Sequence, residues 1–507
     1  MREAALEHAY NAAELLYRNL DAGRSAHPYL TTGSRKWTYQ EVCAAADTAG
    51  AGLLSEGLEQ DARVVLALRD RAEFVIAFWG AMKAGLVPVP VAQGLTASDV
   101  HFILSDSAAS AVVCDRSSAP EVTAAAEHTA ARVVIVGEQA SREALRWSEL
   151  CANSGSLPTT RTTESDIALW LYTSGTTGLP KAVMHRHGSL KAAPAALSDQ
   201  VIGLQPDDLV LSVSKMFFAY GLGNSVYLPA AAGACVILNE GPVIPGRINE
   251  LVAATRPTVI FGIPSFFSGF TRLPDASLPS STRMVLSAGE ALSAPLFDGF
   301  KARFELPLLD GLGSTEALHH VTNNRPDDAV PGSAGRPLEG YEIDVRDVGG
   351  ERLTEGISGE LWIRGPTLFA GYWKRPELTD RVRRDGWVRT GDRVRVEEGR
   401  LYHEGRLDDL IKLGGIWLAP AEIEDVLRSH PDVTDAAVIT ADDRSGVPTL
   451  KAFVASGRAP RELVAEIRAL CKSHLARAKA PTTFEVLPEL PRTASGKLQR
   501  FILRSRP

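Results

Sequence analysis

Short apolar runs, many of them rich in β-branched residues, alternate with helical stretches between about residues 63 and 287. The runs at 63–68, 111–114, 133–136, 167–172, 209–213, 234–238, 258–261 and 284–286 have the composition of buried strands. Segments between them, such as 72–84, carry apolar residues at helical spacing. This alternation predicts largely parallel sheets covered by helices, with ligands bound in loops beyond the carboxyl ends of the strands.

The pattern changes after about residue 332. Segments 341–345 and 360–363 alternate polar and apolar residues, which predicts a smaller antiparallel or barrel-like subdomain. Beyond residue 406 the pattern predicts helices at 419–428 and 462–475 and strands at 435–439, 450–454 and 481–486. The predicted fold class is therefore α/β: a large N-terminal domain of parallel-type sheets with a β-barrel-like subdomain, followed by a small α+β domain.

Composition limits the possible functions. A chain of 507 residues is too long for one hydrophobic core, and its net charge of -7 argues against a nucleic-acid partner. The 5 cysteines are far apart and form no CxxC pair, which predicts a reduced protein without disulfides or structural zinc. The first 20 residues resemble an amphipathic helix more than a signal peptide, and no apolar run is long enough to span a bilayer. We therefore expect a soluble, cytoplasmic protein with no membrane partner.

One loop after a predicted strand carries the composition of a phosphate-binding site. Its glycines let backbone N–H groups approach an anion, its hydroxyl groups add donors, and its lysine adds positive charge. The residues are Thr173, Ser174, Gly175, Thr176, Thr177, Gly178 and Lys181. No GK[ST] follows the glycines, so this is not a Walker A loop. The loop predicts a polyphosphate cradle.

The stretch from Tyr172 to Lys181 resembles the signature loop of the adenylate-forming superfamily, which includes acyl-CoA synthetases, peptide-synthetase adenylation domains and luciferases. Further motifs follow in that family's order over nearly the whole chain. The resemblance implies an ATP-dependent enzyme that converts a carboxylate into an acyl-adenylate. It also implies an N-terminal adenylation domain at 1–405 with a β-rich part at about 332–405, a hinge at 406–409 around Asp408, and a mobile C-terminal lid domain at 410–507.

The same resemblance assigns nucleotide-binding residues. Those expected around the adenine are Ala288, Gly289, Glu290, Asp310, Gly311, Leu312 and Gly313, with Asp310 accepting from the amino group. Thr315 is expected at the α-phosphate, and Glu316 as a ligand of the Mg²⁺ that accompanies ATP, because a hard cation prefers oxygen ligands. Asp392 is expected to accept from the ribose hydroxyls, and Arg406 to lie near the ribose and phosphates.

A heptapeptide near the end, residues 491–497, resembles the family loop that inserts a catalytic lysine, here Lys497. Negative charge increases as a carboxylate attacks the α-phosphate, and an ammonium group stabilises it. Lys497, Lys181 and Thr315 are therefore the expected catalytic residues.

Residues 215–224 resemble the acid-binding segment of benzoate–CoA ligases. The expected pocket residues are Phe218, Ala219, Tyr220, Gly313 and His319, whose flat walls fit a ring better than a long acyl chain. His320 is expected to face solvent, whereas His185 and His187 are expected to be structural. An aryl carboxylic acid is thus the expected substrate.

The acyl acceptor is less defined by the sequence. Lys412, Gly414 and Gly415 resemble the loop that faces the active site when CoA ligases form the thioester, so CoA is the expected acceptor. An amine or a carrier-protein thiol remain the alternatives within the same superfamily. A degenerate, non-catalytic sensor of nucleotide or acyl ligand is the alternative outside enzymes, and it is disfavoured because Lys497 and Glu316 are both present.

Overall fold

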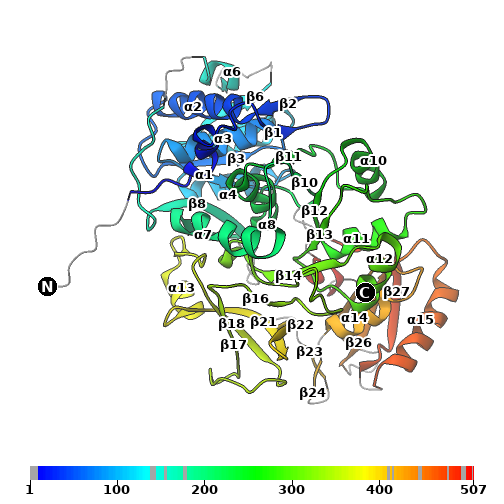
Figure 1. Cartoon of the computed structure of the whole chain (residues 1–507). Helices are drawn as coiled ribbons and strands as arrows, with labels where there is room; N and C mark the ends of the chain where they lie inside the picture. The colour runs from blue at the N-terminus through cyan, green and yellow to red at the C-terminus, as the bar shows by residue number, and fades with distance from the viewer. Residues whose placement is uncertain are drawn as a thin grey trace.

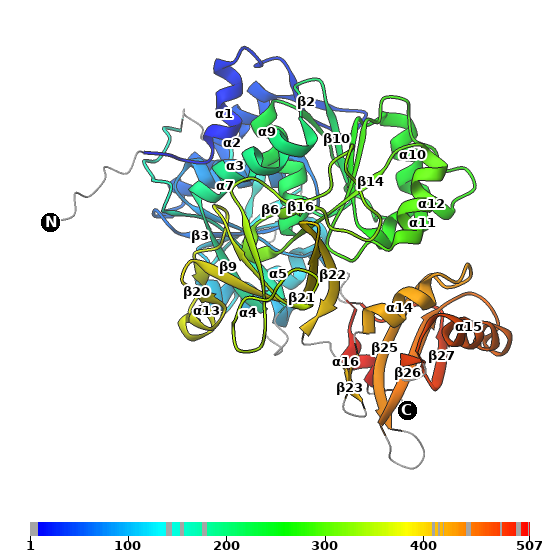
Figure 2. The same ribbon diagram turned by 60° about the horizontal axis from the view of Figure 1, so that its bottom comes forward.

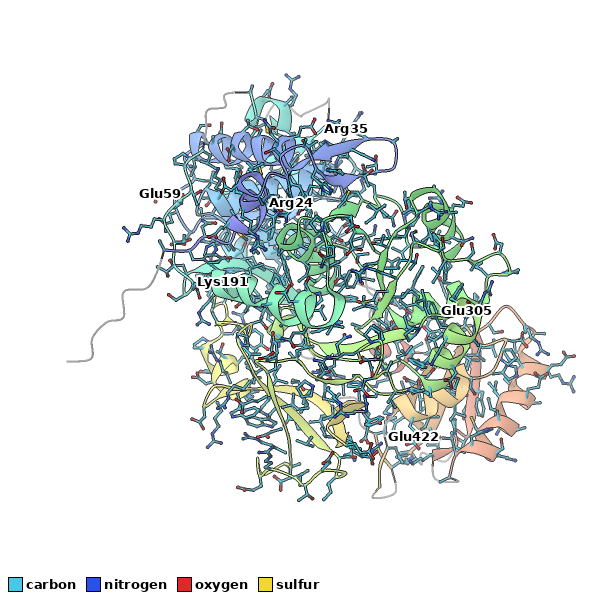
Figure 3. All side chains as sticks on the ribbon, viewed as in Figure 1. Arg24, Arg35, Glu59, Lys191, Glu305 and Glu422 are labelled. Carbon is cyan, nitrogen blue, oxygen red and sulfur yellow. The ribbon has the colours of Figure 1, made fainter. Side chains whose placement is uncertain are left out.

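The computed structural model describes residues 9–137, 144–152, 157–174, 180–407, 411–413, 416–418, 420–442, 448–476, 479–492, 498–504 and 506. Figure 1 shows the N-terminal elements in blue at one end of the molecule and the orange and red C-terminal elements at a far corner. Exposed charged side chains such as Arg35, Glu59 and Glu422 lie on the outside of the molecule (Figure 3). None of the described helices is both long and apolar enough to cross a membrane.

One predicted parallel sheet is formed by the first half of the strand–helix alternation. Its strand order is β4-β3-β5-β6-β7, and every neighbouring pair is parallel. The strands are β3 (Arg63–Ala67), β4 (Val87–Pro90), β5 (Ala111–Asp115), β6 (Arg132–Val136) and β7 (Leu145–Arg146). The helices of this region are α2 (Tyr39–Ser55), α3 (Ala72–Lys83), α4 (Ala97–Ser107), α5 (Ala119–Ala126) and α6 (Trp147–Leu150).

A nine-stranded sheet with the order β16-β15-β14-β13-β12-β10-β11-β1-β2 forms the centre of the molecule. Its strands are β1 (Pro28–Thr31), β2 (Lys36–Thr38), β10 (Leu209–Ser212), β11 (Cys235–Ile237), β12 (Val259–Gly262), β13 (Met284–Ser287), β14 (Leu308–Gly313), β15 (His320–Asn323) and β16 (Arg336–Pro337). The pairs from β1 to β14 are parallel, whereas β2, β15 and β16 add antiparallel edges.

Helices between these strands complete the layered arrangement that the alternation predicts. They are α1 (Glu14–Asp21), α7 (His187–Leu197), α8 (Ala219–Leu222), α9 (Leu228–Ala232), α10 (Pro245–Thr255), α11 (Pro264–Arg272) and α12 (Ala294–Phe304). Helix α1 begins inside the predicted N-terminal helix, and residues 1–8 lie outside the described part of the chain.

The strand that precedes the phosphate loop differs from the expectation of parallel pairing. Strand β8 (Ile167–Ser174) pairs antiparallel with β9 (Pro180–Arg186), and β9 pairs antiparallel with β19 (Gly371–Tyr372). The reason is the short connection, because a parallel crossover needs a dozen or more residues and a hairpin needs only a few. Strands β8 and β9, which flank the predicted phosphate loop, therefore form a hairpin (the phosphate hairpin), and Thr173 pairs with Lys181 in it.

The β-rich region after residue 332 is an antiparallel sheet of five strands. They are β17 (Glu342–Arg346), β18 (Gly359–Arg364), β20 (Arg383–Arg384), β21 (Trp387–Glu397) and β22 (Arg400–Arg406). The short helix α13 (Pro376–Val382) precedes β20. Strands β21 and β22 form a hairpin in which Asp392 pairs with Arg406.

The C-terminal part forms an α+β unit with its own buried clusters, seen apart from the other sheets in Figure 2. Its strands are β23 (Ile411–Leu413), β24 (Ile416–Leu418), β25 (Asp435–Asp442), β26 (Pro448–Ala455) and β27 (Thr483–Leu487), and its helices are α14 (Pro420–Arg428), α15 (Pro460–His474) and α16 (Arg500–Arg504). A hydrogen bond of 3.0 Å from Arg272 Nη1 to the Val433 carbonyl joins this unit to α11.

Candidate active site

Two predicted nucleotide motifs leave the central sheet side by side. Strands β13 and β14 are parallel neighbours, and Ser287 at the end of β13 pairs with Asp310 on β14. The segments that follow them, 288–290 and 311–316, therefore start from the same edge of the sheet. This is the edge at which parallel sheets bind ligands.

Glu316, Tyr372 and Lys181 form a hydrogen-bonded group beside the phosphate hairpin. The Tyr372 hydroxyl donates to Glu316 Oε1 at 2.7 Å and accepts from Lys181 Nζ at 2.8 Å. Lys181 Nζ also lies 3.6 Å from Glu316 Oε1 and 3.9 Å from the centre of the Tyr372 ring. Burial and the charge of Glu316 raise the pKa of Tyr372, so the hydroxyl stays protonated and acts as a donor.

Backbone contacts fix the segment that carries Thr315 and Glu316. A short 3₁₀ helix, Thr315–Ala317, is capped by the Ser314 hydroxyl, which accepts from the backbone N–H of Ala317. His185 Nε2 donates to the Thr315 carbonyl at 2.8 Å. The backbone N–H of Phe369 donates to the Glu316 carbonyl at 2.8 Å. His185 is thus a structural contact, as expected, between the phosphate hairpin and this segment.

Asp310 is a buried carboxyl group with an unused hydrogen-bond acceptor atom. Its side chain is buried, and Oδ1 has no hydrogen-bond partner among the described residues. Burial raises its pKa well above the usual range, and nearby Ser287 and backbone N–H groups offset only part of this effect. The Asn324 amide donates to the Asp310 carbonyl at 3.0 Å and holds its backbone. An amino group on a bound base would supply the missing hydrogen bond.

The other residues expected around the adenine fall into two groups. Ala288 is buried, Gly289 has a φ of +86° that suits glycine, and Leu312 packs partly buried against the main core. Glu290 is engaged elsewhere, because its carboxylate accepts from both the backbone N–H and the hydroxyl of Ser265 in the first turn of α11. Its side chain therefore stabilises the start of that helix.

Asp392 lies in a cationic setting on the β21–β22 hairpin. Its Oδ1 is 3.0 Å from Arg406 Nη1 and 3.3 Å from His403 Nε2. Burial opposes ionisation of Asp392, but the hydrogen bond from His403 and the charge of Arg406 outweigh it and lower the pKa. Arg406 also donates to the Thr390 carbonyl at 2.7 Å. Asp392 is thus held ionised as an acceptor, whereas no sequence motif identifies His403 as its partner.

The expected acid-binding residues come together through aromatic contacts. The Tyr220 ring is 5.4 Å from the His319 ring, centre to centre, and its hydroxyl donates to the Leu286 carbonyl at 3.4 Å. The amide oxygen of Asn224, the last residue of the predicted acid-binding segment, accepts from His319 Nε2 at 3.0 Å. A Cβ atom on Gly223 would be 2.3 Å from the His319 ring, so glycine there makes room for the histidine.

Other expected acid-binding residues flank this group. Ala219 is buried, and the centres of the Phe218 and Phe217 rings are 4.2 Å apart. At Gly313 on β14 a Cβ atom would be 2.2 Å from the His319 carbonyl oxygen, so β14 closely approaches the backbone just before β15.

The expectation that His320 faces solvent is wrong. His320 is 2% exposed, and its ring stacks on Tyr220 with centres 5.2 Å apart and an angle of 19° between the planes. It begins β15, in which all four residues are buried, so both faces of this strand are covered and His320 has no route to solvent.

Several predicted site residues lie outside the described part of the chain. They are Gly175, Thr176, Thr177, Gly178, Asp408, Gly414, Gly415 and Lys497. For Ser174 and Lys412 only the backbone, in β8 and β23, is described. Arg383 donates to the carbonyls of Phe369 and Ala370 and so makes a structural contact.

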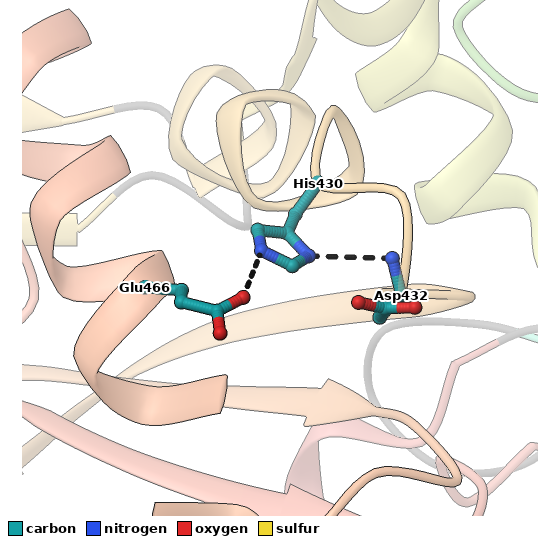
Figure 4. A group of neighbouring side chains, drawn as sticks. All are labelled: His430, Asp432 and Glu466. Carbon is teal, nitrogen blue, oxygen red and sulfur yellow. Dashed lines mark hydrogen bonds and ion pairs between the residues drawn. The ribbon is translucent and has the colours of Figure 1, made fainter. Parts of the chain in front are cut away.

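A cluster of His430, Asp432 and Glu466 in the C-terminal unit has the composition of a metal site (Figure 4). Both ring nitrogens of His430 are engaged, because Nδ1 accepts from the Asp432 backbone N–H at 3.3 Å and Nε2 donates to Glu466 at 3.1 Å. Arg458 pairs with both carboxylates. The contacts therefore describe a structural link between α14 and α15 rather than a set of metal ligands.

Comparison with known families agrees with this geometry. The model of the AMP-binding enzymes matches residues 18–373, and the model of the AMP-binding enzyme C-terminal domain matches residues 422–497. The chain therefore belongs to the AMP-binding enzyme family, the adenylate-forming superfamily expected from its motifs.

Similar proteins within this family are named as CoA ligases of aromatic acids. The chain is 35% identical to a 4-hydroxybenzoate–CoA/benzoate–CoA ligase of Rhodopseudomonas palustris, over 98% of this chain and 94% of the relative. It is 35% identical to a benzoate–CoA ligase of Thauera aromatica, over 98% and 96% of the two chains. The crystal structure of an anthranilate CoA ligase in complex with anthranoyl-AMP superimposes with a TM-score of 0.94 at 31% identity, covering 100% of this chain and 98% of that one.

Proposed function

We propose that this protein is an aryl carboxylic acid–CoA ligase of the benzoate type. It joins ATP and an aryl acid into an aryl-adenylate with release of pyrophosphate, and then transfers the aryl group to CoA with release of AMP. The observation that supports this most strongly is the short spacing from Glu316 to His319. One turn of chain connects the Glu316–Tyr372–Lys181 group to the aromatic contacts of His319 and Tyr220.

In this proposal different polar groups contact the base, the ribose and the phosphates of the nucleotide. Asp310 accepts from the adenine amino group, beside the backbone of 288–290 and 311–313. Asp392 accepts from the ribose hydroxyls, and Arg406 keeps it ionised. Lys181 and Thr315, with Thr173, Ser174, Gly175, Thr176, Thr177 and Gly178 of the hairpin loop, bind the phosphates.

Glu316 suits the Mg²⁺ that accompanies ATP. It presents a carboxylate beside the phosphate hairpin, and hard divalent cations prefer such oxygen ligands together with phosphate oxygens. When bound, the ion would neutralise phosphate charge. The Tyr372 hydroxyl would hold the Glu316 carboxylate in position through its hydrogen bond to Oε1.

The chemistry needs positioning and charge stabilisation rather than a protein nucleophile. A carboxylate oxygen of the acid attacks the α-phosphorus, and the bond to the pyrophosphate leaving group breaks. Lys181 and Lys497 stabilise the negative charge that develops. The CoA thiolate then attacks the acyl carbon, and AMP leaves with the electron pair of the broken C–O bond.

We further propose that the second step uses a different placement of the C-terminal region. The N-terminal domain would span 1–405, the hinge 406–409 with Asp408, and the C-terminal domain 410–507. Rotation about a few backbone torsions would exchange Lys497 for Lys412, Gly414 and Gly415 on the CoA side. We place the reaction in the cytoplasm, where both ATP and CoA are available.

The experiment that tests the proposal is analysis of products by mass spectrometry. The protein is incubated with benzoate, ATP and Mg²⁺, with CoA, with a primary amine, or with neither. We expect benzoyl-CoA and stoichiometric AMP only in the presence of CoA. An aryl amide formed in preference to the thioester would contradict CoA as the acceptor, and no AMP with any acceptor would contradict the ligase activity.

A further inference from the structure

His320 is a buried polar side chain with unused hydrogen-bonding capacity. Neither ring nitrogen has a hydrogen-bond partner among the described residues, although the side chain is only 2% exposed. The side chain of Asn323 lies beside the ring and can hydrogen-bond one of the two nitrogens, which leaves the other nitrogen without a partner. A buried polar group that is left unpaired destabilises the fold, whereas an apolar ring of the same shape would avoid this cost. One nitrogen of His320 therefore needs a partner that the described residues do not supply.

The position of His320 connects it to the acid-binding residues. Its ring stacks on Tyr220, and the Tyr220 ring also contacts His319 at 5.4 Å. Across the β14–β15 pair, a Cβ atom on Gly311 would be 2.7 Å from His320 Nδ1 and 2.1 Å from Asn323 Oδ1, so both side chains pack directly against the Gly311 backbone. The ring of His320 thus belongs to the group of rings proposed to hold the aryl acid.

Proton transfer does not explain this histidine. Burial lowers its pKa to about 4, with a smaller opposing effect of Asn323, so the ring is neutral at pH 7. A neutral imidazole offers one N–H donor and one nitrogen acceptor. Those are the partners that a hydroxyl or an amino group requires, and a hydrocarbon ring has neither.

We propose that His320 determines substrate specificity by hydrogen-bonding a hydroxyl or amino substituent on the ring of the aryl acid. The substrate is then a hydroxybenzoate or aminobenzoate, in preference to an acid of equal size without a hydrogen-bonding group. This inference rests on the proposed function, because it assumes that the Tyr220–His319 group holds the ring.

The test compares isosteric pairs of acids in ATP–pyrophosphate exchange. Hydroxy-, amino- and methylbenzoates substituted at ring positions 2, 3 and 4 are assayed with the wild-type protein. We expect kcat/KM at one ring position to be on the order of tenfold or more higher for the hydroxyl or amino acid than for its methyl analogue, mainly through KM. Equal values for each pair at all positions would overturn the inference. Activity with none of the benzoates would instead overturn the proposed function, and this inference with it.

Substitutions then assign the preference to one side chain. His320→Phe keeps a flat ring against Tyr220 but removes both nitrogens, so the ratio of polar to methyl acid should fall toward one. His320→Gln keeps a donor and an acceptor and should retain part of the ratio. His128→Phe makes the same change at an exposed histidine and should leave the ratio as in wild type. A ratio that survives in His320→Phe would overturn the role of His320, and thermal melting of each variant shows whether a lost activity reflects lost folding.

Discussion

The Tyr372 hydroxyl lies 2.7 Å from Oε1 of Glu316, a residue 56 positions earlier in the chain. Tyr372 reaches this place because β19 pairs with β9, the strand that also carries Lys181. One hydroxyl therefore holds both the carboxylate proposed for Mg²⁺ and the ammonium proposed for the phosphates. Both groups are positioned before a nucleotide binds, which lowers the cost of organising them during the reaction.

Removing this hydroxyl should impair adenylate formation. In Tyr372→Phe the ring stays beside Lys181, but Glu316 loses its donor. We expect the exchange rate to fall by roughly tenfold or more and the Mg²⁺ concentration at half-maximal rate to rise. A Mg²⁺ titration of ATP–pyrophosphate exchange measures both. Tyr402→Phe, which changes a tyrosine packed against Arg395, is the matched control. A titration curve identical to wild type would contradict the positioning role of Tyr372.

The packing of Gly223 against His319 gives a second prediction. A Cβ atom there would be 2.3 Å from the ring, so Gly223→Ala must displace the histidine. Overpacking of this kind costs about 1–3 kcal/mol. We expect KM for the aryl acid to rise by roughly tenfold and KM for ATP to rise much less, measured by initial rates. Gly246→Ala, where no atom lies within 4 Å of the added carbon, should behave as wild type. Equal increases in both KM values would argue against His319 as an acid-binding residue.

Because His187 is buried and unprotonated, we expect the folded protein to lose stability in mild acid. Burial lowers its pKa to about 4, and its Nδ1 accepts from the Ala12 backbone N–H at 3.0 Å, which requires the unprotonated nitrogen. The unfolded chain binds the proton more readily, so stability present above about pH 6.5 is lost as the pH falls. This single group should lower the free energy of unfolding by about 2 kcal/mol between pH 7 and pH 5.

Urea unfolding at both pH values measures this effect. His187→Asn keeps an acceptor near the same place and cannot be protonated, so its stability should fall less between pH 7 and pH 5 than that of the wild type. An unchanged pH dependence in His187→Asn would show that other groups are responsible.

Lys497 gives a prediction that separates catalysis from folding. Lys497→Ala removes the ammonium proposed between the carboxylate and the α-phosphate, so exchange should fall by about 100-fold or more while the melting temperature stays the same. Lys472→Ala, an exposed lysine on α15, should leave exchange unchanged. Wild-type exchange in Lys497→Ala would remove this residue from the mechanism.

Apolar periodicity was sufficient to predict the parallel sheets, because buried parallel strands are continuous apolar runs. It predicted β10, β12 and β13 to within about one residue at each end. It did not predict how β8 pairs, because an apolar run has the same composition in a parallel or an antiparallel sheet. Only the short connection to β9 distinguishes the two arrangements.

The same limit explains which site residues the sequence could not identify. Asp392 and Glu316 belong to recognisable motifs, whereas Tyr372 and His403 reach them through strand pairing between distant segments. His320 was misplaced for a related reason. Alternation along a strand sends neighbouring residues to opposite faces, but both faces of β15 are buried, so neither His320 nor Val321 reaches solvent.

The most direct measurement is ATP–pyrophosphate exchange across a panel of carboxylic acids. The panel contains substituted benzoates, acetate and palmitate, each at matched concentrations with Mg²⁺ and without CoA. If the protein activates an aryl acid as its adenylate, benzoate-type acids should drive exchange far faster than acetate or palmitate. Fastest exchange with palmitate or acetate would contradict an aryl acid substrate, and no exchange with any acid would contradict adenylate formation itself.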